Sequence, residues 1–119
     1  QCGSVPKNLP AIASIAIEKY ATKLKEGTRT AAYIDVREPD EWEEGHMTGA
    51  RSIPMAELAF HLDNLKKYSR IYLSCRSGVR SEICTRTLDN LGFPDVVNVA
   101  GGYKAWESAG YPVEKSEKK

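Results

Sequence analysis

Short runs of apolar residues alternate along the chain with stretches in which apolar residues recur every three to four positions. The runs predict strands, because consecutive β-branched and apolar residues are typical of strands that are covered on both faces. These strands lie near residue 12 and at 31–36, 50–53, 70–74 and 96–99.

The stretches between the runs predict amphipathic helices. They cover 15–26, 39–44, 58–65, 78–91 and 103–109. The helix at 78–91 is expected to turn its apolar residues inward, namely Val79, Ile83, Cys84, Leu88 and Leu91. Strands separated by helices need right-handed crossovers, so we predict an α/β fold: a parallel sheet of about five strands with helices on both faces.

A length of 119 residues fits one domain, and 41% hydrophobic with 28% charged residues is ordinary for a globular protein. We expect an irregular segment at 1–10, a single domain at 11–113 and a charged, disordered tail at 114–119. The net charge of +1 is spread along the chain, which argues against a nucleic-acid partner and favours a small molecule.

No apolar run reaches the roughly 18–20 residues that a membrane span needs. The chain begins with Gln1 and lacks the basic and apolar layout of a signal peptide. The compartment stays open: a cytoplasmic location is slightly favoured, and a periplasmic or organellar one would apply if a targeting segment ahead of Gln1 was removed.

The three cysteines, Cys2, Cys75 and Cys84, are too few and too unevenly spaced for a disulfide framework. His46 and His61 lack a matching set of ligands, so no metal site is expected. No cofactor is expected either, because a nucleotide-binding loop needs a third glycine that the Gly101-Gly102 doublet lacks.

The strongest chemical signal joins the strand at 70–74 to the next helix: Cys75-Arg76-Ser77-Gly78-Val79-Arg80-Ser81. Backbone N–H groups in a tight turn at a helix N-terminus favour an anion and lower the pKa of a thiol that faces them. Arg76 and Arg80 add charge that would hold an anionic sulfur donor, and Gly78 permits the tight curvature. Free cysteine also packs as a small hydrophobe, so the local chemistry favours a nucleophile without deciding the matter.

This turn resembles the active-site loop of single-domain rhodaneses, the thiosulfate sulfurtransferase-like family. Segments before and after it resemble the family's other signatures and follow in the same order along the chain. They are Asp35-Val36-Arg37-Glu38 with Glu41-Trp42, Gly45-His46-Met47-Thr48-Gly49-Ala50 with Ile53-Pro54, and Gly101-Gly102-Tyr103 with Trp106 and Gly110-Tyr111-Pro112-Val113. Together they span about residues 30 to 113.

The resemblance implies a rhodanese fold and a sulfurtransferase. In this reaction Cys75 takes the outer sulfur of thiosulfate or a related donor, holds it as a persulfide and passes it to cyanide or a thiol, including a protein thiol. The loop amides would bind the donor and stabilise the persulfide, and they belong to Arg76, Ser77, Gly78, Val79 and Arg80. Asp35 and Arg37 resemble the family's buried polar pair, which supports the site.

Two alternatives stay open. Cysteine phosphatases and arsenate reductases with a related fold use Cys-x5-Arg, whereas the arginine here falls at Cys-x4-Arg, in a smaller cradle better matched to one sulfur atom. The second alternative is a non-catalytic rhodanese module that binds or regulates a protein partner, although such modules often lack the cysteine.

The remaining candidates have plainer interpretations. A thiolate held by dipoles and arginines needs no base, so we expect His46 to be structural. Cys84 shares a helical face with Leu88, which favours core packing over a resolving thiol. His61 is expected to be exposed, and the role of Cys2 stays open.

Overall fold

The protein is built around a five-stranded parallel sheet in the order β1-β6-β5-β2-β4. The structure, a computed structural model, describes residues 12–115. The strands of this sheet are β1 (Ser14–Ile15), β2 (Ala31–Asp35), β4 (Arg51–Ser52), β5 (Arg70–Ser74) and β6 (Val96–Val99). Within the part of the chain that the structure describes, no helix is long and apolar enough to cross a membrane.

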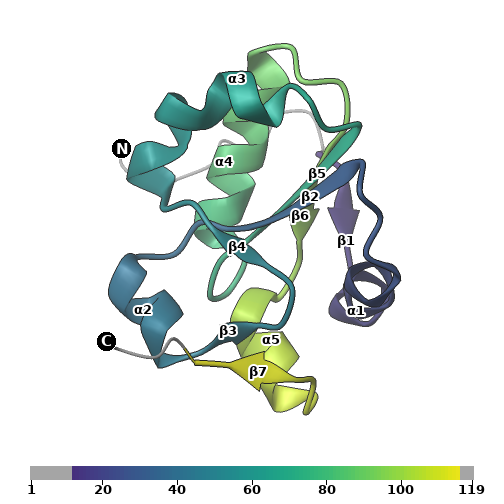
Figure 1. The fold of residues 1–119 in the computed structure, drawn as a ribbon, viewed down its shortest axis with the longest axis vertical. Coiled ribbons are helices and arrows are strands. Elements are labelled where there is room, and N and C mark those ends of the chain that lie inside the picture. Colours follow the sequence, from purple (N-terminus) through teal and green to yellow (C-terminus); the bar gives the residue numbers. More distant parts are fainter. Residues whose placement is uncertain (1–11, 116–119) are drawn as a thin grey trace.

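Helices cover both faces of the sheet (Figure 1). The helices on one face are α1 (Ile17–Glu26) and α5 (Gly102–Ser108). On the other face lie the 3-10 helix η1 (Met55–His61), α3 (Leu62–Leu65) and α4 (Val79–Asn90). The predicted α/β fold with helices on both faces is confirmed.

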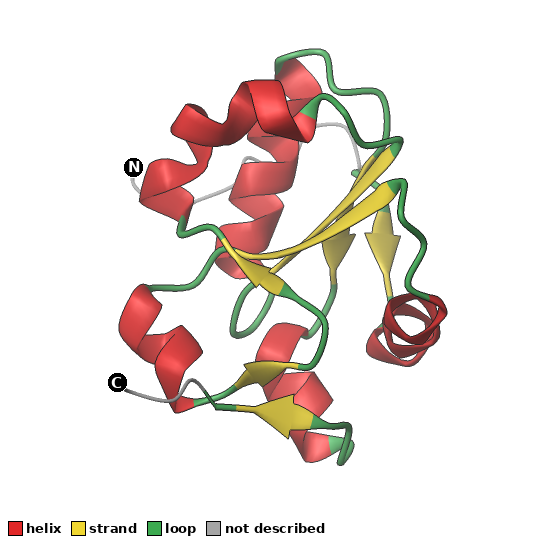
Figure 2. Cartoon of the chain, viewed as in Figure 1, coloured by secondary structure: helices red, strands yellow, loops and turns green. Residues whose placement is uncertain are grey.

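A second, smaller sheet stands apart from the main one (Figure 2). It pairs β3 (His46–Met47) with β7 (Val113–Glu114) in antiparallel register. The short helix α2 (Pro39–Glu44) precedes β3 and begins with proline at its first position, where the missing N–H costs nothing. The prediction that the tail includes residue 114 is wrong, because Glu114 is the strand partner of His46.

Two apolar clusters fill the space between sheet and helices, because successive side chains of a strand point to opposite faces. Ile34 of β2 and Leu73 of β5 point toward α4, whereas their neighbours Tyr33 and Tyr72 point toward α1. Tyr33 and Tyr72 are register partners, and their rings stack with centroids 5.3 Å apart. The central strands are thus buried on both sides, as their unbroken apolar runs predicted.

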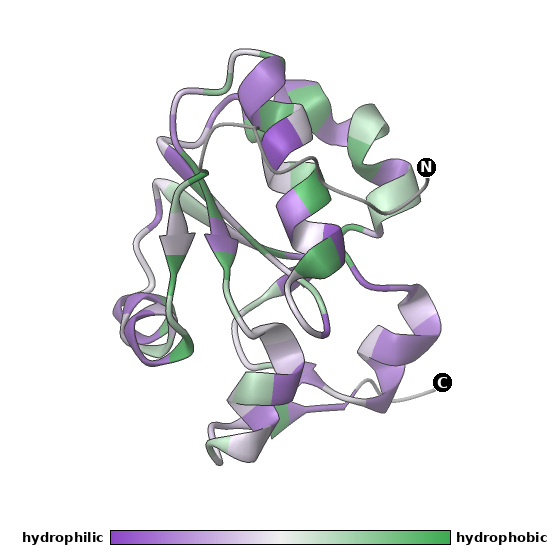
Figure 3. Ribbon diagram, turned by 180° about the vertical axis from the view of Figure 1, so that it is seen from behind, coloured by the Kyte–Doolittle hydropathy of each residue, from purple (hydrophilic) through white to green (hydrophobic). Residues whose placement is uncertain are grey.

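Helix α4 alternates between hydrophobic and hydrophilic positions along its length (Figure 3). Cys84 and Leu88 are buried as predicted, but Val79 and Leu91 are 54% and 57% exposed. Val79 is the first residue of the helix and Leu91 its C-cap, and neither belongs to the buried stripe of Ser81, Cys84, Thr85 and Leu88. The predicted helix at 58–65 is only partly an α-helix, because its first residues belong to the 3-10 helix η1. The prediction that His61 is exposed is wrong, because its side chain is half-buried.

These exposures predict a large loss of stability at one leucine near the end of α4 and almost none at another. Leu88 is fully buried, so Leu88→Ala should lower the free energy of unfolding by about 2–5 kcal/mol through lost burial and a cavity. Leu91→Ala, the matched control, should change it by less than about 0.5 kcal/mol. Urea unfolding monitored by circular dichroism measures both, and equal losses would contradict the orientation of the helix.

Candidate active site

Cys75 follows directly after the last residue of β5, at the carboxyl end of the sheet, and is only 1% exposed. The loop from Cys75 to Gly78 then leads into the N-terminus of α4. Gly78 has a φ of +103°, a left-handed conformation that favours glycine. This conformation turns the chain back so that the first N–H groups of α4 face the thiol.

Backbone donors surround the sulfur of Cys75. The N–H of Gly78 lies 3.1 Å from Cys75 Sγ, and the N–H of Ser81 lies 3.4 Å from it. Burial alone would raise the pKa of this thiol, but hydrogen bonds from the Ser81 side chain and from the amides of Ser81, Gly78 and Ser77 outweigh it. The pKa of Cys75 is therefore lowered, which favours the reactive thiolate.

The N-terminus of α5 holds the loop from its other side. Tyr103 N–H donates to the carbonyl of Cys75 at 2.7 Å, and Lys104 N–H donates to the carbonyl of Arg76 at 2.9 Å. These bonds pull the carbonyls toward α5 and leave the opposite side of the loop to N–H groups. Gly102 makes this approach possible, because a Cβ there would clash with the Cys75 carbonyl and lie 2.7 Å from the Arg76 carbonyl oxygen.

Asp35 and Arg37 form a buried ion pair behind the loop, and each side chain is 2% exposed. Arg37 Nη2 donates to Asp35 Oδ2 at 2.8 Å and to the carbonyl of Gly45 at 2.7 Å. The Arg37 guanidinium also lies 4.3 Å from the centre of the Tyr103 ring. The pair thus supports Tyr103, whose amide holds the Cys75 carbonyl.

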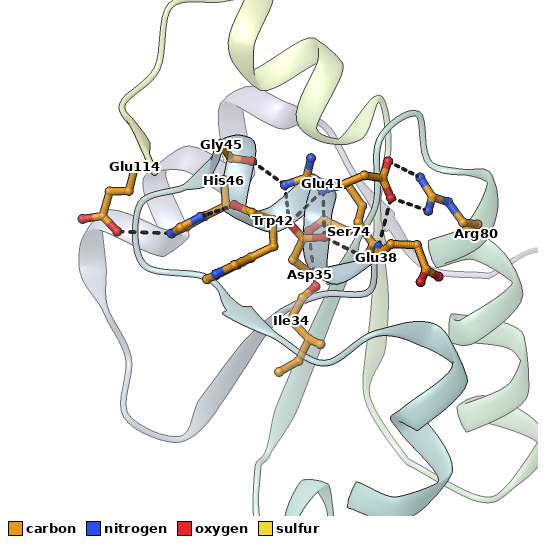
Figure 4. Close-up of polar contacts among 11 residues, drawn as sticks. Ile34, Asp35, Glu38, Glu41, Trp42, Gly45, His46, Ser74, Arg80 and Glu114 are labelled. Carbon is orange, nitrogen blue, oxygen red and sulfur yellow. Dashed lines mark hydrogen bonds and ion pairs between the residues drawn. The ribbon is translucent and has the colours of Figure 1, made fainter. Parts of the chain in front are cut away.

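The Arg80 side chain forms an ion pair with Glu41 of α2 (Figure 4). Its Nη1 lies 2.8 Å from Glu41 Oε1 and its Nη2 lies 3.1 Å from Glu41 Oε2, the bidentate geometry that suits arginine and carboxylate. The hydrogen bonds from Arg80 lower the pKa of Glu41 to about 2, against the opposing effect of burial. The other loop side chains, Arg76, Ser77 and Val79, are exposed.

Comparison with known proteins agrees with this arrangement. The family model of the rhodanese-like domain matches residues 18–109. The chain belongs to the rhodanese-like domain family. The predicted membership of the rhodanese family is therefore confirmed. The activity that this membership supports, at the level of the family, is sulfur transfer.

Relatives and solved structures of the family cover most of the chain. It is 39% identical to protein YqhL of Bacillus subtilis over 71% of this chain and 67% of the relative. It is 31% identical to thiosulfate sulfurtransferase GlpE of Pseudomonas putida over 93% of both chains. The crystal structure of a rhodanese-like domain protein from Staphylococcus aureus superposes with a TM-score of 0.75 and 31% identity, covering 89% of this chain and all of that one.

His46 of this rhodanese-like domain is tied into the small sheet, near α2. Its Nδ1 donates to the carbonyl of Trp42 at 2.8 Å, and its ring stacks on the Trp42 ring at 3.5 Å. Its Nε2 lies 3.6 Å from Glu114 Oε1 (Figure 4). These contacts join α2 to β3 and β7, which is the kind of structural role that the sequence favoured.

Cys84 is buried in the apolar cluster around α4. Burial, followed by the charge of Cys75, raises the pKa of its thiol to about 12. A thiol with this pKa is almost entirely protonated near neutral pH, so the packing role favoured by the sequence agrees with its surroundings. Cys2 lies outside the described residues.

Several contributors to the site were not singled out from the sequence, among them Lys104 at the start of α5. Ser81 was noted only as the end of the loop, Gly102 only as part of a family signature, and Glu41 only as part of another. The position of Ser81 in the first turn of the helix was a usable signal, because amides there are free to bind an anion. Nothing in the sequence indicated that Gly102 meets Cys75 or that Glu41 meets Arg80. Among residues 12–115, no three His, Cys, Asp or Glu side chains cluster as metal ligands would.

The lowered pKa predicts selective alkylation of Cys75. Iodoacetamide should modify Cys75 near neutral pH, and the rate should rise with pH through a midpoint below that of an ordinary thiol. Cys84 should stay unmodified under the same conditions. Peptide mass mapping after timed alkylation distinguishes the two, and faster labelling of Cys84 would contradict the assignment.

Gly102→Ala should disturb the loop more than an alanine at another left-handed glycine. Gly110 also has a positive φ, but a Cβ there meets nothing within 4 Å. Gly110→Ala thus measures the conformational strain alone, about 1 kcal/mol, whereas Gly102→Ala adds the clash with the loop carbonyls. Thermal unfolding and the alkylation rate of Cys75 report both effects, and matching results would show that close approach at Gly102 is unimportant.

Proposed function

We propose that this rhodanese-like domain transfers sulfane sulfur from thiosulfate or a related anionic donor, with Cys75 as the carrier. The observation that carries the proposal is the cradle of N–H groups around the buried Cys75 Sγ, at 3.1 Å from Gly78 and 3.4 Å from Ser81. Such a cradle stabilises a negative sulfur both before and after the sulfur is received. The relative GlpE, a thiosulfate sulfurtransferase, supports the choice of donor.

In the first half-reaction the Cys75 thiolate attacks the outer sulfur of thiosulfate. A new S–S bond forms to Cys75, the bond between the two sulfurs of thiosulfate breaks, and its electron pair leaves on sulfite. The product is a Cys75 persulfide anion, so the total charge is unchanged. Arg76, exposed at the loop, is placed to attract the dianionic donor.

In the second half-reaction an acceptor attacks the terminal sulfur of the persulfide. Cyanide becomes thiocyanate, or an acceptor thiolate becomes a persulfide. The electron pair of the broken S–S bond returns to the Cys75 sulfur. The amides that held the thiolate also hold the persulfide, so the chemistry needs no proton donor. A protein thiol that reaches Cys75 is an acceptor by the same chemistry.

The position of Arg80 supports sulfur transfer over phosphatase or arsenate chemistry. Enclosing a tetrahedral oxyanion requires an arginine at the end of the loop directed at the anion. Here the Arg80 side chain is held by both oxygens of Glu41. The Cys-x4-Arg loop then presents mainly backbone donors, which suit a single sulfur atom.

Thiocyanate formation from thiosulfate and cyanide tests the proposal. The parent protein should turn over, and thiosulfate alone should add the mass of one sulfur to it. Cys75→Ser should lose both properties, a fall of at least about 10³-fold, because the hydroxyl of serine is far less acidic and nucleophilic than a thiol. Cys84→Ala, the matched control, should retain both.

A parent protein that shows neither turnover nor added sulfur would refute thiosulfate as the donor. Turnover that survives in Cys75→Ser would refute Cys75 as the carrier. Hydrolysis of an aryl phosphate by the parent, lost in Cys75→Ser, would favour the phosphatase alternative.

A further inference from the structure

Some guanidinium groups around the loop have their charge neutralised by a carboxylate, and one does not. Arg37 is paired with Asp35 and Arg80 with Glu41, both through short contacts of 2.8 Å. Arg76 is exposed and takes part in no ion pair with the residues that the structure describes. The loop thus displays one uncompensated guanidinium, although its sequence contains two arginines.

Glu41 is held in place independently of Arg80. Its Oε1 also accepts the backbone N–H of Glu38 at 2.9 Å, which completes a capping box at the start of α2. The carboxylate is therefore anchored to the backbone and keeps a fixed position opposite Arg80 (Figure 4). With a pKa of about 2, Glu41 is ionised at any pH at which the enzyme would work.

Arg80 belongs to the loop that carries the nucleophile. It directly precedes Ser81, whose amide contacts Cys75 Sγ, and its charge interacts favourably with that of Cys75. A positive charge at this position would attract an anionic donor, and more strongly when the donor carries two charges. Glu41, in contact with Arg80 at 2.8 Å, leaves the pair with no net charge and so weakens that attraction at distances larger than the pair itself.

We infer that Glu41 is a specificity-determining residue, which neutralises Arg80 and so favours sulfur donors with one negative charge over the thiosulfate dianion. The inference rests on the proposed sulfur transfer. Thiosulfate remains a donor because Arg76 attracts it. The Glu41–Arg80 ion pair reduces its electrostatic advantage over donors with one charge. The preferred class comprises persulfide anions and thiosulfonates, in which the transferred sulfur carries the only charge.

The charge at the site is measured first by a reaction that does not depend on sulfur transfer. Iodoacetate is an anion and iodoacetamide is neutral, and both alkylate the same thiolate, so the ratio of their rates reports the potential at Cys75. Glu41→Gln keeps the shape and an acceptor oxygen but removes the charge. The iodoacetate to iodoacetamide ratio at Cys75 should rise about fivefold in this variant.

Two further variants identify the source of the change. Asp89→Asn, on the exposed side of α4 near its far end, alters the net charge equally and should leave the ratio unchanged. Glu41→Gln combined with Arg80→Gln restores a neutral pair and should return the ratio to the parent value. An unchanged ratio in Glu41→Gln, or a raised ratio that persists in the double variant, would overturn the inference.

Sulfur donors then test the specificity itself. Thiosulfate and methanethiosulfonate both surrender an outer sulfur to the Cys75 thiolate, releasing sulfite and methanesulfinate, and differ by one charge. The ratio of their kcat/KM values, thiosulfate over methanethiosulfonate, should rise about fivefold in Glu41→Gln. A constant donor ratio despite a changed alkylation ratio would refute the role in specificity. Absence of turnover with either donor in the parent would instead refute the proposed function, while the alkylation result would still judge the role of Glu41 in setting the charge.

Discussion

Two backbone hydrogen bonds from the N-terminus of α5 to the carbonyls of Cys75 and Arg76 determine how the site is arranged. A loop of a few residues presents either carbonyls or amides to a buried atom, and an anionic sulfur is stable only against amides. By binding the carbonyls, Tyr103 and Lys104 leave the amide side for Cys75 Sγ. Gly102 is essential to this contact, because any side chain there would push the helix away from the loop.

The charged residues around the loop serve different ends. The fully buried pair of Asp35 and Arg37 packs against Tyr103 and ties it to the carbonyl of Gly45, so it links the small sheet to the nucleophile. The half-buried pair of Glu41 and Arg80 fixes α2 against the start of α4. One pair thus positions the backbone that holds the loop, and the other sets the charge beside it, although Arg37 and Asp35 also act electrostatically on Glu41 and Arg80.

Most of the fold was predictable because it depends on local patterns. The apolar runs at β2, β5 and β6 are buried on both faces, and the helical periods between them mark helices that cover those faces. Local patterns were less informative at the ends of elements. Val79 and Leu91 were assigned to the apolar face of α4 but lie at its two ends and are exposed, and Glu114 joins a strand whose partner is 68 positions away.

The sequence by itself determined the order of the elements, the position of Cys75 after β5 and the presence of Gly78 among the amide donors, because these follow from residues that are neighbours along the chain. Only the tertiary structure decided which charges remain available at the site. Arg80 looks like a free cation in the sequence, yet it meets Glu41 across 39 positions, and Gly102 meets the loop across 27 from Cys75. Such contacts depend on how helices pack against the sheet, which local periodicity does not encode.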